Sequence, residues 1–214
     1  MEKITLVCTS LNPDERLLNK MLQSAIGFDE VILHIDPFSK YYDYFINYPK
    51  SGSPIRRYFS STHLDIAQAY NTLISQADDG WICCFCDDDY FFPELSQMID
   101  EVHKGIDADV AHFQFRVSGH RPFKDLRSWV KGSIYYLWED KPITVKLLEK
   151  HNRLPAGSFF RKSAWEKVGG FQGDKCHDWD LWKRMVKAGC TFKYFPYLVY
   201  DYVRREGSSW QKQN

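Results

Sequence analysis

A short apolar segment that ends in three consecutive aspartates constrains this chain more than any other stretch. Residues Trp81–Phe85 are apolar and β-prone, Asp87, Asp88 and Asp89 follow after one residue, and Pro93 suits the first turn of a helix. An apolar run bounded by turn signals is typical of a strand buried on both faces, as in parallel sheets. Open α/β sheets bind ligands outside the carboxyl ends of their strands, where these carboxylates would lie. Because the three charges repel one another, the cluster predicts a divalent cation, Mg²⁺ or Mn²⁺.

The rest of the chain alternates between strand-like and helix-like patterns, which predicts an α/β fold with a mostly parallel, Rossmann-like sheet flanked by helices. The first helix is expected to have Asn12 as its N-cap and Pro13 at its first position. Further strands are expected at Lys3–Thr9, Glu30–Ile35, Ile55–Phe59, Asp109–Val117 (at a sheet edge), Gly157–Arg161, Thr191–Phe195 and Leu198–Val203. A second helix is expected to begin at Thr62, with Asp65 in a capping box. Other helices are expected over Pro93–His103, Pro142–Lys150 and Ser163–Val168, and from Cys176 to Ala188.

Composition narrows the class of protein. The 214 residues fit one domain over 1–214, and no repeat or linker divides them. Lys and Arg together number 28, as do Asp and Glu, so the chain lacks the strong positive charge of a dedicated nucleic-acid binder. We see no signal peptide and no membrane span. The six cysteines lack zinc-site spacing and are expected to be reduced, which predicts a cytoplasmic protein.

Acidic residues recur at two other places where an α/β fold carries function. Asp36 follows a predicted strand, and Asp178 with Asp180 opens a predicted helix. Each has a plain structural alternative, a turn at Asp36 and a helix N-terminus at Asp178. Together with the aspartate triplet they suggest a cation, a phosphorylated ligand and a carboxylate able to act as a base.

Six motifs in a fixed order make the chain resemble glycosyltransferase family 2, whose members adopt the GT-A fold. Asp87-Asp88-Asp89 fits the D-x-D motif of this family, and the match runs over nearly the whole chain. The other motifs are Thr9-Ser10-Leu11-Asn12-Pro13, Asp36 with Ser39, the Ala67–Ile74 segment with Asn71, Gly169-Gly170-Phe171, Asp178-Trp179-Asp180-Leu181 with Arg184, and the tail with Arg204, Gly207 and Ser208.

The resemblance implies an enzyme that moves a sugar from a nucleoside-diphosphate sugar, a UDP-sugar by preference, to a hydroxyl acceptor, with Mn²⁺ or Mg²⁺ and with inversion. It implies that Asp178 is the catalytic base and that Asp87 and Asp89 bind the metal. The donor-binding residues that it implies are Thr9, Asn12, Asp36, Asn71, Asp87, Asp88 and Arg205, and the acceptor-binding ones are His177, Trp179 and Asp180. Residues 1–105 would then form the donor half, and residues 106–214 the acceptor half with its small C-terminal subregion.

The chain departs from the family pattern at three positions. His177 precedes Asp178 where a Glu is usual, Tyr70 replaces an Arg, and Arg205 replaces the tail His, so that Arg205 is expected to contact the diphosphate directly.

Three alternatives remain open. The first is a nucleotidyltransferase, which would carry a basic Gly-rich loop that Thr9–Arg16 lacks. The second is a two-metal nuclease, which would have a more basic surface. The third is a catalytically silent sugar-nucleotide or carbohydrate-binding module, which would tolerate loss of Asp178.

Overall fold

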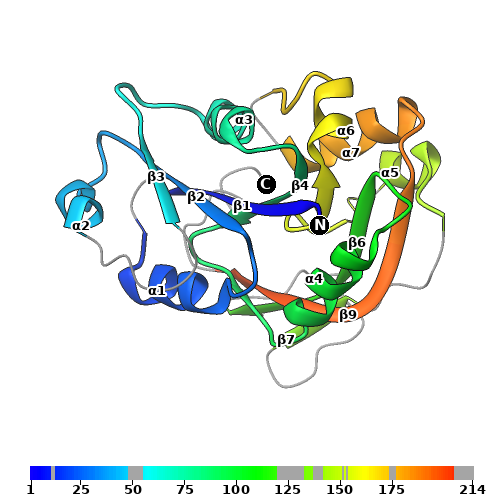
Figure 1. Cartoon of the computed structure of the whole chain (residues 1–214), viewed down its shortest axis with the longest axis horizontal. Coiled ribbons are helices and arrows are strands. Elements are labelled where there is room, and N and C mark those ends of the chain that lie inside the picture. Colours follow the sequence, from blue (N-terminus) through cyan, green and yellow to red (C-terminus); the bar gives the residue numbers. More distant parts are fainter. Residues whose placement is uncertain are drawn as a thin grey trace.

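The computed structural model describes residues 1–10, 13–47, 55–119, 133–136, 142–150, 152, 154–173 and 177–204, and they are built around one mixed β-sheet (Figure 1). Its strand order is β3-β2-β1-β4-β8-β6-β9-β5, and β7 pairs with β6. The strands are β1 (Lys3–Ser10), β2 (Glu30–Ile35), β3 (Ile55–Phe59), β4 (Gly80–Cys86), β5 (Tyr90–Phe91), β6 (Val110–Gly119), β7 (Ser133–Tyr136), β8 (Phe159–Arg161) and β9 (Phe192–Arg204). The helices are α1 (Glu15–Ser24), α2 (Tyr42–Asn47), α3 (Ile66–Gln76), α4 (Leu95–Lys104), α5 (Val145–Lys150), α6 (Lys162–Lys167) and α7 (His177–Lys187).

The parallel part of the sheet is its N-terminal half, where β3, β2, β1 and β4 all run in the same direction. This confirms the predicted α/β class. The sheet becomes mixed at β8, which pairs antiparallel with both β4 and β6, while β6 and β9 are parallel again. The carboxyl ends of β1, β2, β3 and β4 therefore share one edge, which is where ligands of such sheets bind.

Two predictions for the C-terminal half are wrong. The strand expected at a sheet edge over Asp109–Val117 is β6, which lies inside the sheet with β8 and β9 as neighbours. The two strands expected over 191–203 form one long strand, β9, whose register against β6 shifts on both sides of Gln114. Pro196 lies in this strand and has no N–H to donate to the ladder, so a local irregularity lets the strand continue instead of ending.

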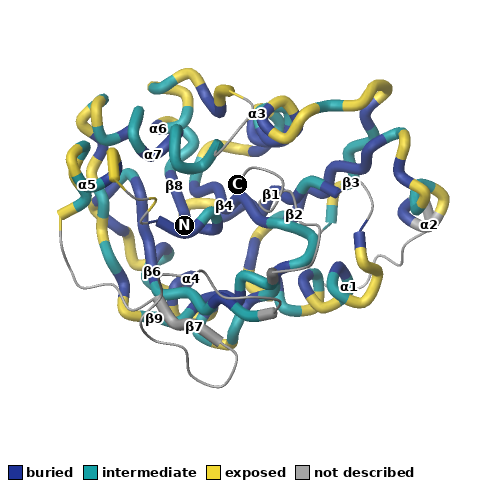
Figure 2. Tube along the Cα trace, turned by 180° about the vertical axis from the view of Figure 1, so that it is seen from behind, coloured by how far each residue is buried: buried dark blue, intermediate teal, exposed yellow. Residues whose placement is uncertain are grey.

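Helices cover both faces of the sheet and enclose two hydrophobic cores. In Figure 1, α3, α6 and α7 lie on one side of the central strands, and α1 and α4 lie on the other. On the α1 and α4 side, Met21 and Met98 pack with Tyr200 of β9. On the other side, Leu73 of α3 packs with Trp182 of α7. The burial pattern follows these layers, with buried strands at the centre and exposed helix surfaces outside (Figure 2).

Two helices begin at caps other than those expected. The cap of α1 is Asp14, whose carboxylate accepts a hydrogen bond from Leu17 N at 3.1 Å, and the predicted cap Asn12 lies outside the described residues. The cap of α3 is Asp65, which forms a capping box with Gln68, so Thr62 is not part of the box. In both cases an Asp one residue before the helix satisfies a free N–H group of the first turn.

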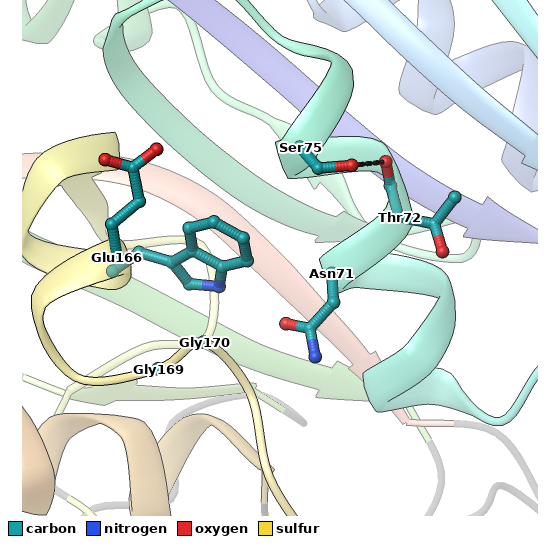
Figure 3. Close-up of a pocket in the computed structure, with 7 residues that line it drawn as sticks. Asn71, Thr72, Ser75, Glu166, Gly169 and Gly170 are labelled. Carbon is teal, nitrogen blue, oxygen red and sulfur yellow. Dashed lines mark hydrogen bonds between the residues drawn. The ribbon is translucent and has the colours of Figure 1, made fainter.

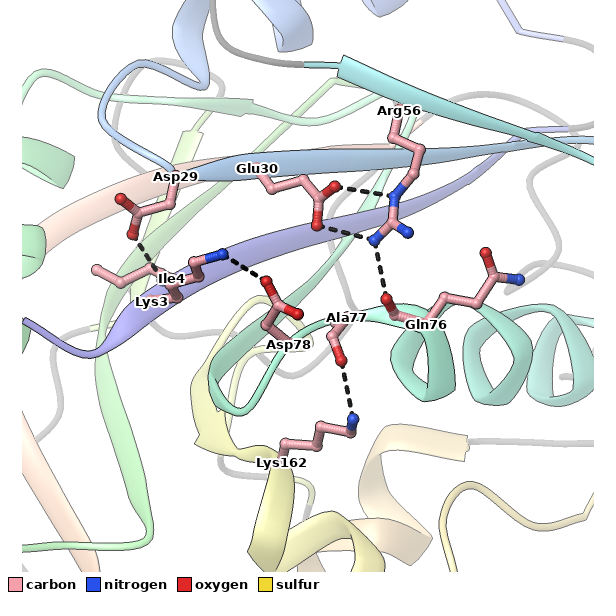
Figure 4. A network of polar contacts seen from close by, with 9 residues as sticks. All are labelled: Lys3, Ile4, Asp29, Glu30, Arg56, Gln76, Ala77, Asp78 and Lys162. Carbon is pink, nitrogen blue, oxygen red and sulfur yellow. Dashed lines mark hydrogen bonds and ion pairs between the residues drawn. The ribbon is translucent and has the colours of Figure 1, made fainter.

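The amino-terminal edge of the parallel strands is closed by ion pairs and hydrogen bonds (Figure 4). Arg56 lies 2.8 Å from Glu30 and also donates to the carbonyl of Gln76. Lys3 pairs with Asp78, and Lys162 donates to Ala77 O. These contacts tie the end of α3 to the strands and leave the opposite, carboxyl edge for binding.

The described part of the chain contains no helix that is both long and apolar enough to cross a membrane. The described cysteines are free thiols: Cys8, Cys83, Cys84, Cys86 and Cys190. The cytoplasmic location stays a prediction.

Candidate functional site

Asp36 lies just past β2 at the carboxyl edge and is 2% exposed. One of its oxygens accepts a hydrogen bond from Phe38 N at 2.8 Å, and the other lies 2.7 Å from His63 Nδ1. The ring of His63, in the loop after β3, is exposed beside the exposed ring of Phe38. The edge thus holds a fixed carboxylate bordered by an imidazole.

Asp87 lies just past β4 and faces the neighbouring strand β1. Its Oδ2 accepts a hydrogen bond from Ser10 Oγ at 2.8 Å, so the register of β1 and β4 sets its position. Thr9, a predicted donor contact, is half-buried at the carboxyl end of β1, next to Ser10. The hydroxyl of Tyr70 on α3 donates to Phe85 O of β4 at 3.1 Å, which holds α3 against the sheet at this edge.

Asp89 and Asp88 belong to a second group, which also contains Cys86. One ligand atom from each of these three residues lies within 4.8 Å of the others. Asp89 is 3% exposed and its Oδ1 accepts a hydrogen bond from Val203 N of β9 at 2.8 Å. The structure thus groups Asp89 with Asp88 and Cys86, whereas Asp87, the other predicted metal ligand, lies on the Ser10 side.

The chemistry of this group fits a divalent cation. Burial, followed by the negative charge of Asp88, raises the pKa of Asp89 well above its ordinary value, and the Val203 N–H opposes the shift. A cation beside Asp89 would offset both unfavourable effects, because it stabilises the charged form. Two carboxylates suit Mg²⁺ or Mn²⁺. Burial, followed by the charges of Asp89 and Asp88, raises the pKa of the Cys86 thiol well above its ordinary value, so Cys86 would join the site as a soft ligand when a cation displaces the thiol proton.

Asp178 opens α7, as predicted, and its side chain is half-buried. Its Oδ2 accepts a hydrogen bond from Asn152 Nδ2 at 2.8 Å. Burial raises the pKa of Asp178, and the Asn152 hydrogen bond opposes the shift. Burial raises the pKa of the Tyr200 hydroxyl, and the charges of Asp89 and, to a smaller extent, Asp178 add to the shift, so the two carboxylates lie within electrostatic range of one side chain.

Two of the three residues expected to bind the acceptor, Trp179 and Asp180, make structural contacts. Trp179 Nε1 donates to Leu148 O of α5 at 2.6 Å, and Asp180 accepts a 2.7 Å hydrogen bond from Arg184 one turn later on α7. His177 is the first residue of α7, and its Nδ1 has no hydrogen-bond partner among the described residues.

Asn71 is likewise occupied by the protein itself. Its amide donates to Phe171 O at 2.9 Å and accepts from Phe171 N at 2.8 Å, which ties α3 to the turn after α6. Gly170 has a positive φ of 72°, and a Cβ there would lie 2.8 Å from Asn71 Oδ1, so the Gly-Gly-Phe motif serves this contact. A shallow groove of about 550 Å³ lies beside it, between α3 and α6 (Figure 3).

Three contacts at the carboxyl edge were missed by the sequence interpretation: Ser10 on Asp87, His63 on Asp36, and Cys86 beside Asp88 and Asp89. The first two join residues that are far apart in the sequence, since Ser10 and Asp87 are 77 residues apart and His63 and Asp36 are 27 apart. Cys86 adjoins the aspartates in sequence and was the one detectable signal. Two predicted residues, Asn12 and Arg205, lie outside the described residues.

Comparisons with known proteins agree with this architecture. The structure is similar to that of residues 1–349 of S. aureus TarS in complex with UDP-GlcNAc, with a TM-score of 0.73, 14% identity, and coverage of 96% of this chain and 60% of that one. It is also similar to the same TarS fragment alone (TM-score 0.71, 13% identity, 94% and 60% covered) and in complex with UDP (TM-score 0.68, 14% identity, 94% and 60% covered).

The TarS comparison establishes the fold, and the chain spans 60% of the length of that fragment. No match was found among curated proteins. A family model, by contrast, matches the sequence over residues 14–169, which is more than half of the chain and includes Asp36 and the aspartate triplet. The chain therefore belongs to glycosyl transferase family 2.

Proposed function

We propose that the protein transfers a sugar from a UDP-sugar to a hydroxyl acceptor with inversion and depends on Mn²⁺ or Mg²⁺. The observation that carries the proposal is the gathering of Asp36, Asp87, Asp88 and Asp89 at the carboxyl edge of the sheet in a chain of glycosyl transferase family 2. The complex of TarS with UDP-GlcNAc supports UDP-GlcNAc as the first donor to test.

The two groups of acidic residues are assigned to different parts of the donor site, one to the nucleoside and one to the cation at the diphosphate. Asp36 and Asp87 are fixed by His63 and Ser10, and we assign them to the nucleoside. Asp88 and Asp89, with Cys86, would hold the cation, which when bound neutralises charge on the leaving diphosphate. Asn71 positions α3 through Phe171 and does not need to touch the donor. Thr9 remains assigned to the donor. Residues 1–105 then form most of the donor half, and β9 from the acceptor half completes it through Val203.

Asp178 is assigned as the base. Its raised pKa is useful for this role, since a base with a pKa closer to neutral holds the proton of the acceptor hydroxyl more readily. Attack of the hydroxyl oxygen on the anomeric carbon forms one bond as the bond to the diphosphate oxygen breaks, and the proton passes to Asp178. A single displacement of this kind inverts the anomeric centre.

A donor screen tests the proposal. Purified protein is incubated with UDP-GlcNAc and other UDP-, GDP-, dTDP- and CMP-sugars, with Mn²⁺ or Mg²⁺ and then with EDTA, and release of the nucleotide is measured. We expect cation-dependent release from a UDP-sugar, lost in Asp89→Asn and reduced about 10²- to 10⁴-fold in Asp178→Asn. Binding of UDP without turnover of any donor, with or without candidate acceptors, would favour a silent sugar-nucleotide-binding module.

A further inference from the structure

A buried polar cluster lies beside the turn that carries Asp89, and it is distinct from the carboxylates described above. Its centre is Asp201 of β9, which is completely buried. A single oxygen of this carboxylate, Oδ2, accepts hydrogen bonds from Tyr90 Oη at 2.6 Å, from Ser118 Oγ at 2.9 Å and from Arg116 Nη2. Arg116 also donates to Tyr90 Oη at 2.9 Å, so three side chains form a closed triangle.

The triangle lies across three neighbouring strands at a single level of the sheet. Tyr90 of β5 is paired with Asp201 of β9, and Asp201 is paired with Arg116 of β6. Side chains that are directly opposite in a sheet are the closest neighbours between strands, so this row of contacts fixes the register of β5 against β9. β5 has only two residues, and its backbone ladder alone is a weak attachment.

This attachment matters because β5 begins at the residue after Asp89. β9 holds the turn at two points: Asp201 holds Tyr90, and Val203 N donates to Asp89 Oδ1 at 2.8 Å. Loss of the first contact would free the chain on the C-terminal side of Asp89 and weaken the second. The orientation of the remaining oxygen of Asp89 therefore depends on the register between β5 and β9.

Stability alone does not explain the cluster. A buried ion pair contributes little net stability, because removing two charges from water costs about as much as their attraction returns. Moreover, Asp201 Oδ1 is buried without a hydrogen-bond partner among the described residues, which is a cost to folding. Arg116 also packs over the ring of Phe92, with its Cζ 4.8 Å from the ring centroid, so the guanidinium contacts an aromatic ring as well as the carboxylate.

We propose that Asp201 is a positioning residue for the cation site: with Tyr90 and Arg116 it fixes β5 against β9 and thereby aims the Asp89 carboxylate at the cation. This inference rests on the proposed function. Partners that orient a ligand without touching the metal typically account for about 10- to 100-fold in metal affinity, and we expect an effect of that order.

The test measures Mn²⁺ affinity directly, by the electron paramagnetic resonance signal of free Mn²⁺ in the presence of UDP. Asp201→Asn keeps the shape of the side chain and removes its charge, and is expected to weaken Mn²⁺ binding about tenfold or more, with UDP binding in the absence of cation unchanged. Tyr90→Phe removes one hydroxyl and is expected to shift Mn²⁺ affinity in the same direction by less. Glu30→Gln, which breaks the ion pair with Arg56 at the opposite edge, is the matched control.

Mn²⁺ affinities of Asp201→Asn and Tyr90→Phe equal to that of Glu30→Gln would overturn the positioning role. If Asp201→Asn does not fold, Arg116→Lys replaces it, because lysine keeps the charge and loses the planar fork that reaches both Asp201 and Tyr90. Absence of UDP and Mn²⁺ binding in the wild-type protein is a separate result, which would remove the proposed function itself and this inference with it.

Discussion

The Nδ1 atom of His63 lies 2.7 Å from Oδ2 of Asp36, and both residues belong to loops at the carboxyl edge of the sheet. Asp36 is almost completely buried, so its charge is supported mainly by this imidazole and by the N–H of Phe38. The pair makes a rigid acceptor at the place where we assign the nucleoside.

Asp36→Asn is expected to weaken UDP binding about tenfold, because the amide keeps the shape and loses a charged acceptor worth about 1.5–3 kcal/mol in a hydrogen bond. His63→Gln is expected to weaken UDP binding less, since the Phe38 N–H still holds Asp36. Calorimetric titration with UDP in the absence of cation isolates this effect from the metal site. Equal affinities for UDP in wild type and Asp36→Asn would show that Asp36 does not bind the donor.

Cys86 gives the cation group a soft donor beside two hard ones. A thiolate, formed here when a cation displaces the thiol proton, favours Mn²⁺ over the harder Mg²⁺ and binds thiophilic ions such as Cd²⁺. We expect the wild-type protein to bind Mn²⁺ more tightly than Mg²⁺ and to develop the ultraviolet charge-transfer band of a Cd–thiolate bond on titration with Cd²⁺.

In Cys86→Ser the Cd–thiolate band should disappear and the preference for Mn²⁺ should decrease. The control is Cys190→Ser, which removes a free thiol that is not in the cation group. Persistence of the band in Cys86→Ser would show that the thiol does not take part in the site.

The parts of the fold that the sequence predicts are those with local signals. Glu30–Ile35 is a strand over the expected residues because it is a mostly apolar segment bounded by turn residues. Ile55–Phe59 is also a strand over the expected residues, although two arginines lie between Ile55 and the aromatic pair Tyr58-Phe59. β5 has two residues and hence no periodicity, and the interior position of β6 depends on pairing with β9, about 80 residues later in the chain. Long-range pairing leaves no local pattern.

The candidate site divides in the same way. Acidic residues after strands were found from their positions, since parallel strands bring their carboxyl ends together. Their partners were not: Tyr90 and Asp201 are 111 residues apart, and nothing in either segment points to the other. Asn71 was assigned to the donor from its motif alone, whereas in the structure its side-chain amide forms two hydrogen bonds with the backbone of Phe171.

Asp180 and Asp178 lie in the same turn of α7, and their contacts predict different consequences of substitution. Asp180 forms an ion pair with Arg184, whose side chain is only 21% exposed and also donates to Val168 O, so the pair contributes more than the roughly 0.3–0.5 kcal/mol of an exposed pair. Asp180→Asn keeps an oxygen acceptor for Arg184 but removes the charge, and is therefore expected to lower the free energy of unfolding by about 1–3 kcal/mol and to leave donor turnover unchanged. Urea unfolding and the rate of UDP release measure the two effects. A large loss of turnover in this variant would indicate that Asp180 contacts the acceptor, as its motif predicts.

Asp178 should control the pH dependence of turnover. Burial raises the pKa of Asp178, and the hydrogen bond from Asn152 Nδ2 opposes the shift by favouring the carboxylate. A base works only when deprotonated, so kcat should decrease as the pH falls through this raised pKa. Asn152→Ala removes the opposing hydrogen bond, so the pKa of Asp178 should rise further and the acid limb of the kcat profile should move to higher pH.

The profile is measured at saturating Mn²⁺, which keeps Asp89 charged and out of the titration. An acid limb that is unchanged in Asn152→Ala would assign the base to another group.

Stability provides an independent readout of the raised pKa of Asp178. Because the native state binds the Asp178 proton more tightly than the unfolded state does, the contribution of this group to stability is present at low pH and is lost as the pH rises through the raised pKa. Asp178→Asn, which cannot ionise, should therefore be at least as stable as wild type at neutral pH while its turnover is lost, a combination that separates a catalytic role from a structural one.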